Sequence, residues 1–108
     1  MATMTRPDQK VRTDEASKLA PVWQLILLDD DDHTYEYVIE MLGAVFGYST
    51  ERAYQLAKEV DATGRSVIYS GALEIVEMKQ ERVHAYGADW RIERCAGSMT
   101  TVIEPAPM

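Results

Sequence analysis

The sequence predicts an α+β domain whose elements follow in the order β-α-α-β-α-β. Three short segments have the apolar or β-branched composition of strands, and three longer segments carry apolar residues at helical spacing. The chain has 108 residues, of which 46% are hydrophobic and 27% are charged. This length is enough to close one modest core, so we expect a single folded domain.

The first predicted strand covers residues 23 to 28, WQLILL, a short apolar run that four aspartates follow directly. Such a run favours a buried strand that ends at the surface over a helix. A helix is expected next, with Gly47 as the residue that stops it. The apolar positions on one face of this helix are Val38, Met41, Leu42, Val45 and Phe46.

A second helix is predicted to begin after Ser49, a suitable N-cap, and to end at Gly64. Its apolar face contains Ala53, Leu56, Ala57 and Val60. The segment that follows, residues 65 to 70, reads RSVIYS and is β-branched and aromatic at its centre, which indicates a second strand.

The third helix is expected over residues 72 to 86, ending at Gly87. We predict that one side of it carries Ile75, Val76, Val83 and Tyr86. Residues 88 to 98 have no clean period and suit either a hairpin or a loop. The last strand is predicted over residues 100 to 104, TTVIE, with Pro105 ending it.

Charge and composition exclude several function classes. Eleven basic and 18 acidic residues give a net charge of −7, which argues against nucleic acid as a partner. The single cysteine excludes an intrachain disulfide, and no apolar run is long enough for a signal peptide core or a membrane span. We therefore expect a cytoplasmic protein, with a flexible polar arm at residues 1–21 and a folded domain at residues 22–108.

The four adjacent aspartates, residues 29 to 32, repel one another unless something positive offsets their charge. One interpretation is a helix N-terminus, which favours anions. A second interpretation is a hard metal cation bound by the carboxylates. The run lacks the residue spacing of a calcium-binding loop, and we expect no metal. An ammonium group on a ligand is the third, because an apolar helix groove next to carboxylates could hold a charged amine and its hydrophobic neighbour.

The chain has no sequence motif of a catalytic site. It lacks Gly-x-Ser-x-Gly, HExxH, a P-loop and a dinucleotide fingerprint. We therefore expect neither an enzyme nor a cofactor.

From residue 23 to residue 79 the sequence resembles the ClpS-type adaptors of the Clp ATP-dependent protease. The similar segments are WQLILLDDDDHTYEYVIEML, FGYSTERAYQLAKEV, TGRSVIYS and EIVEMK, in that order. The resemblance implies a three-stranded antiparallel sheet packed against three helices, as in the C-terminal domain of the large ribosomal subunit stalk protein. It also implies a disordered N-terminal arm.

The resemblance further implies that the protein binds the N-terminal residue of a substrate protein and delivers it to the N-terminal domain of a Clp AAA+ unfoldase. In this hypothesis Asp30 and Asp31 hold the α-amine with help from Asp61, and Tyr35 and Val60 line the pocket. The full set of residues implied for end recognition is Asp29, Asp30, Asp31, His33, Tyr35, Ala57, Val60, Asp61 and Met99.

Several of these positions depart from the family pattern. Asp29 replaces an asparagine, Asp61 replaces a histidine, and Tyr35 and Ala57 replace methionines. An ionised aspartate only accepts hydrogen bonds, so Asp61 either preserves amine binding by charge or is a solvated helix end. His33 is either a ligand contact or a capping or surface residue.

Glu74 and Lys79 match family positions that contact the unfoldase, and the alternative is an ordinary solvated helix face. Two other hypotheses stay open for the whole chain. One is a ClpS-fold interaction module that has lost recognition of protein ends and docks a protein partner. The other is a metal-binding regulatory domain that uses the aspartates.

Overall fold

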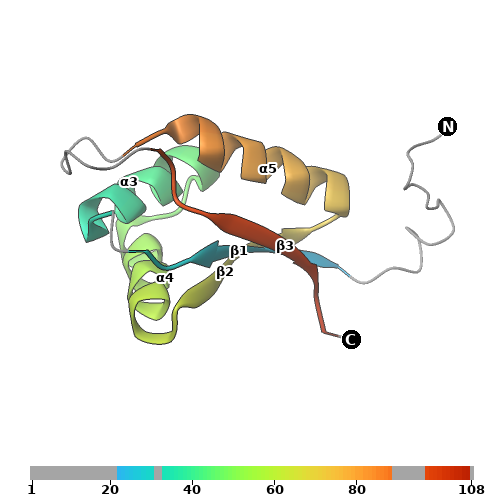
Figure 1. Ribbon diagram of the computed structural model, residues 1–108, viewed down its shortest axis with the longest axis horizontal. Coiled ribbons are helices and arrows are strands. Elements are labelled where there is room, and N and C mark those ends of the chain that lie inside the picture. Colours follow the sequence, from blue (N-terminus) through green and yellow to red (C-terminus); the bar gives the residue numbers. More distant parts are fainter. Residues whose placement is uncertain (1–21, 31–32, 89–96, 108) are drawn as a thin grey trace, which may run out of the picture.

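The computed structural model describes residues 22–30, 33–88 and 97–107 (Figure 1). The predicted arm, residues 1–21, lies outside this range. So do residues 89–96, most of the segment for which the sequence suits either a hairpin or a loop. The described elements follow the predicted order and form an α+β fold with one three-stranded antiparallel sheet and three helices. Among the described residues, no helix combines the length and apolarity needed to cross a membrane.

The sheet is built around strand β1 (Trp23–Leu28), with β2 (Arg65–Gly71) on one side and β3 (Thr101–Pro105) on the other. The last strand ends at Pro105 as predicted, although Pro105 is its final residue, paired with Trp23, rather than the residue after it. A proline lacks the N–H that a central strand would need, but β3 is an edge strand and tolerates it.

The first two helices are α3 (Tyr35–Phe46) and α4 (Thr50–Thr63), and their termini follow the sequence signals. Thr34 Oγ1 accepts the Tyr37 N–H at 3.0 Å and so caps α3. Ser49 caps α4 in the same way, as predicted. Because Thr34 takes the cap of α3, neither Asp29 nor Asp30 serves as its N-cap.

The third helix, α5 (Leu73–Tyr86), runs along the sheet, while α3 and α4 gather near the end of β1 (Figure 1). Val76 and Val83 of α5 are fully buried, two turns apart. Ile75 and Tyr86, which we expected on the same buried side, are each 37% exposed. The buried stripe of α5 is therefore narrower than the sequence suggested.

One core fills the space between the helices and the sheet. Leu25 and Leu27 of β1 are completely buried in this core, and the helix packed most closely against β1 is α5. The other core members without exposed surface are Met41, Leu42, Ala53, Val76 and Val83, and Tyr37 and Ile68 are nearly as deeply buried. Since burial of a large aliphatic side chain contributes about 1.5–3 kcal/mol, this core fixes the relative positions of the helix ends that surround the site.

Candidate functional site

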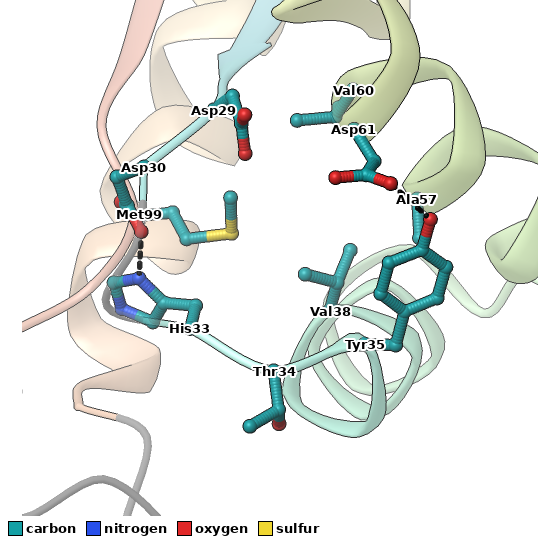
Figure 2. A pocket seen from close by; sticks show the side chains of 10 residues that line it. All are labelled: Asp29, Asp30, His33, Thr34, Tyr35, Val38, Ala57, Val60, Asp61 and Met99. Carbon is teal, nitrogen blue, oxygen red and sulfur yellow. Dashed lines mark hydrogen bonds and ion pairs between the residues drawn. The ribbon is translucent and has the colours of Figure 1, made fainter.

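A cavity of about 240 Å³ opens where β1 ends, between the start of α3 and the last turns of α4 (Figure 2). A typical pocket for a drug-sized ligand measures about 300–1,000 Å³, so this cavity is of a size for a smaller group. The residues that line it are Asp29, Asp30, His33, Thr34, Tyr35, Val38, Ala57, Val60, Asp61 and Met99.

The inner wall of the cavity is apolar. Val38 faces it from the first turn of α3, and Ala57 and Val60 face it from adjacent turns of α4. Met99 completes the wall from the segment before β3, with its side chain directed into the space (Figure 2). All four residues are at most 6% exposed, so their surfaces are already withdrawn from bulk water. This wall suits a hydrophobic side chain.

Two backbone hydrogen bonds fix the acidic side of the cavity. The Asp29 N–H donates to the Gly64 carbonyl at 2.9 Å, and the Leu28 N–H donates to the Thr100 carbonyl at 3.0 Å. Gly64 has φ +88° and ends α4, so the first bond ties the end of β1 to the end of that helix. As a result Asp29 and Asp61 face each other across the mouth of the cavity (Figure 2).

Asp30 has a different environment, because its carboxylate contacts His33. His33 Nδ1 lies 2.7 Å from Asp30 Oδ1, and Nε2 lies 2.9 Å from the Gly97 carbonyl oxygen. A carbonyl oxygen only accepts, so Nε2 donates to it. His33 Nδ1 faces the carboxylate oxygen, so Asp30 has a polar partner within the protein.

His33 itself is a structural residue as much as a cavity residue. Its side chain is 4% exposed, and its ring packs against Tyr37 with centroids 4.6 Å apart. The Tyr37 hydroxyl in turn donates to the Gly87 carbonyl at 2.6 Å. His33 therefore connects the start of α3 to the segment before β3.

The mouth of the cavity is crossed by a hydrogen bond between two helices. The Tyr35 hydroxyl, on α3, donates to Asp61 Oδ2, on α4, at 2.9 Å (Figure 2). This bond raises the pKa of Tyr35 above its ordinary value, with further contributions from desolvation and from the charge of Asp61. The cause is physical, because an ionised phenol would lose the bond and repel the carboxylate.

The structure brings the predicted end-recognition residues together as far as it describes them. Every one of them except Asp31 lines this single cavity, and Asp31 lies outside the described residues. Thr34 and Val38 also line the cavity, although neither is among the predicted end-recognition residues. Both carried a signal, since Thr34 precedes the helix as a cap and Val38 begins its apolar face. Among the described residues, no cluster of three or more metal-ligating side chains occurs.

Glu74 and Lys79 lie on α5, away from the cavity. The helix begins just after Gly71, which pairs with Trp23 at the start of β1, whereas the cavity follows the end of that strand. Glu74 is exposed, and Lys79 Nζ sits 5.6 Å from the ring centroid of Phe46 and 5.4 Å from that of Tyr69. Both distances are within the range of cation–π contacts.

Comparisons with known proteins agree with this geometry. The family model described as ATP-dependent Clp protease adaptor protein ClpS matches residues 18–90. The adapter protein ClpS of Salmonella arizonae is 34% identical over 84 residues, which is 76% of this chain and 79% of that protein. The ClpS of Corynebacterium efficiens is 30% identical over 96 residues, covering 89% of this chain and 94% of that protein.

One solved structure has a similar fold. It is Agrobacterium tumefaciens ClpS2 bound to L-phenylalaninamide, with a TM-score of 0.69 and 22% sequence identity. The similarity covers 81% of this chain and 99% of that chain. The β-α-α-β-α-β arrangement is therefore found in both proteins.

Proposed function

This chain belongs to the ClpS family of ATP-dependent Clp protease adaptor proteins, and we propose that its cavity binds the N-terminal residue of a substrate protein for delivery to a Clp AAA+ unfoldase. The observation that carries the proposal is the pairing of an apolar wall with carboxylates at the mouth of one small cavity. An N-terminal residue presents the two complementary groups, a side chain and an ammonium group, on one Cα atom.

Asp29 and Asp61 are the proposed amine ligands. Each lines the cavity, and both are exposed at its mouth. An ammonium group has three donors and an ionised carboxylate accepts only, so the two are complementary. Asp30 contributes less in this proposal, since His33 already contacts its Oδ1.

The first side chain would enter between Val38, Val60 and Met99. A volume of about 240 Å³ leaves room for one amino-acid side chain rather than for a longer ligand. The related ClpS2 structure contains L-phenylalaninamide, an amino acid amide with an α-amine and an apolar ring, which supports this class of ligand.

The adaptor function in this proposal is binding and delivery, without catalysis by the adaptor. Glu74 and Lys79 on α5 are the proposed contacts for the N-terminal domain of the unfoldase. Ile75 and Met78 on the same helix are 37% and 39% exposed and add apolar surface next to these charges. A mixed charged and apolar surface of this kind suits a protein partner.

A direct test compares two fluorescent peptides of one sequence, with a free and an acetylated N-terminus. Peptides that begin with Phe, Leu, Trp or Tyr cover the expected side chains. We expect the free peptide to bind at least about tenfold more tightly, because acetylation removes the charge that the carboxylates attract. Asp61→Asn should reduce this preference, and Glu81→Gln, on the exposed face of α5, should not. Equal affinity of the wild-type protein for both peptides would contradict the proposal.

That contrary result would favour a second function, a ClpS-fold module that docks a protein partner without reading its end. The specific observation in its favour is that two carboxylates already have partners, Asp30 with His33 and Asp61 with Tyr35. Such a module would bind its partner through α5 whatever the chemistry of the partner's N-terminus.

A further inference from the structure

We propose that Tyr35 is a positioning residue for amine recognition, because its hydroxyl holds one oxygen of Asp61 and leaves the other oxygen to accept the α-ammonium. The inference rests on the proposed function, since it assigns to Tyr35 a part in binding the same N-terminal residue. The observation behind it is the hydrogen bond of 2.9 Å from the Tyr35 hydroxyl to Asp61 Oδ2.

Asp61 needs such a restraint because of its location. It follows Val60 on α4, one position beyond the buried face of the helix, and it is exposed. An exposed aspartate near a helix end samples several rotamers, and only some of them direct the carboxylate into the cavity. Ordering a free side chain on binding weakens affinity, so a carboxylate that is ordered in advance binds its ligand more tightly.

Tyr35 is well placed to supply this order. It is the first residue of α3, directly after the cap Thr34, so its backbone is fixed by a helix terminus. Its ring meets the ring of Tyr54 with centroids 6.0 Å apart, and this contact limits its motion. The bond joins residues 26 positions apart and thus connects the two helices that form the mouth.

The same tyrosine also forms part of the cavity wall. Tyr35 lines it together with Ala57, whose small side chain is 4% exposed. A substrate side chain that displaces the tyrosine ring would also pull the hydroxyl away from Asp61. Recognition of the first side chain and recognition of the amine are therefore coupled through one residue.

The test uses Tyr35→Phe, which keeps the ring and removes the hydroxyl. We expect this substitution to weaken binding of the free-amine peptide by about 3–10-fold, the cost of ordering one charged side chain. Binding of the acetylated peptide should not change, because the apolar wall is intact. Tyr54→Phe is the matched control, since it removes a hydroxyl from the neighbouring ring and leaves the hydrogen bond between Tyr35 and Asp61 in place.

A double-mutant cycle separates positioning from a general structural effect. In the Asp61→Asn background, Tyr35→Phe should have little further effect on the free-amine peptide, because the carboxylate it positions is gone. An equal loss in both backgrounds would overturn the inference, and so would a loss shared by the free and acetylated peptides. If the wild-type protein prefers the free amine and Tyr35→Phe changes nothing, the inference fails while the proposed function stands.

Discussion

Two of the adjacent aspartates, Asp29 and Asp30, are neighbours in sequence and yet have different environments. Asp30 contacts the buried imidazole of His33, whereas Asp29 faces the cavity from a backbone that is fixed by Gly64. A third carboxylate, Asp61, comes from another element and completes the mouth. The chemistry of the site thus depends on which carboxylate oxygens have a partner within the protein and which can accept a hydrogen bond from a ligand.

At the residue scale, the phenol of Tyr35 reports on Asp61 directly. Because the hydrogen bond to Asp61 is the largest cause of its raised pKa, Asp61→Asn should lower the pKa of Tyr35 toward the ordinary value of a tyrosine. The neutral phenol is the form that donates, so the bond is lost only as the pH rises through this raised pKa. Titration of ¹³C-labelled tyrosine side chains by NMR measures the change.

The control for this titration is Asp29→Asn, which removes a neighbouring charge and leaves the hydrogen bond in place. Asp29 is the weakest of the causes that raise the pKa of Tyr35, so its removal should have a smaller effect. An unchanged Tyr35 titration in the Asp61→Asn protein would show that the phenol and the carboxylate do not interact in solution.

At the element scale, α5 presents Lys79 on an aromatic surface. The rings of Phe46 and Tyr69 stack with centroids 5.7 Å apart, and the Lys79 ammonium lies near both. We expect Lys79→Ala to weaken binding to the N-terminal domain of a Clp unfoldase by about 5–30-fold, in the range of an interface residue that costs 1–2 kcal/mol when truncated. Peptide affinity at the cavity should stay at the wild-type value.

Isothermal titration of the adaptor with the isolated unfoldase domain measures the first effect, and peptide anisotropy measures the second. Lys58→Ala is the matched control, because Lys58 also lies over an aromatic ring, that of Tyr54, but on α4. If Lys58→Ala and Lys79→Ala weakened domain binding equally, α5 would not be the docking element.

The elements that the sequence predicts well are those with local signals. Ser49, Gly47 and Gly64 mark helix ends through their own backbone preferences, and each lies where it was expected. Pro105 also marks a strand end, but it belongs to the strand as its last residue, because an edge strand tolerates a proline and one sequence does not show which strand lies at the edge. Ile75 was expected on the buried side of α5 and is exposed instead. Its burial depends on how closely α5 packs against the rest of the protein, and local sequence patterns do not predict this.

The site was only partly predictable for the same reason. Residues 29, 57 and 60 could be assigned from order and resemblance, since they lie in matched segments. The contacts that set the chemistry of the site join residues far apart in the sequence. His33 contacts Gly97, 64 positions away, and Tyr35 contacts Asp61, 26 positions away. Neither pair leaves a pattern in one sequence.

At the scale of the whole molecule, the two proposed binding surfaces are separated along the sheet. The cavity follows Leu28 at the end of β1, and α5 begins beside the start of that strand. A substrate and an unfoldase domain could therefore bind at the same time without competing for the same residues, which is what delivery requires.

The net charge of −7 adds a long-range component to recognition of a cationic chain end. A peptide whose only charge is its α-ammonium should be attracted before contact, and salt should weaken this attraction. Between about 20 mM and about 500 mM NaCl, where the Debye length falls from roughly 20 Å to about 4 Å, we expect its association rate to fall several-fold. Its dissociation rate should change less, because steering acts mainly on encounter. Stopped-flow fluorescence measures both rates.

The acetylated peptide is the control, because it carries no charge for the field to act on. Its association rate should be nearly independent of salt. If instead the free peptide associated at the same rate throughout this range, the acidic surface would have no part in steering, and attraction of the amine would be confined to direct contact with the carboxylates at the mouth. Asp61→Asn distinguishes the two, because a single site charge contributes to contact and little to a field produced by a net charge of −7.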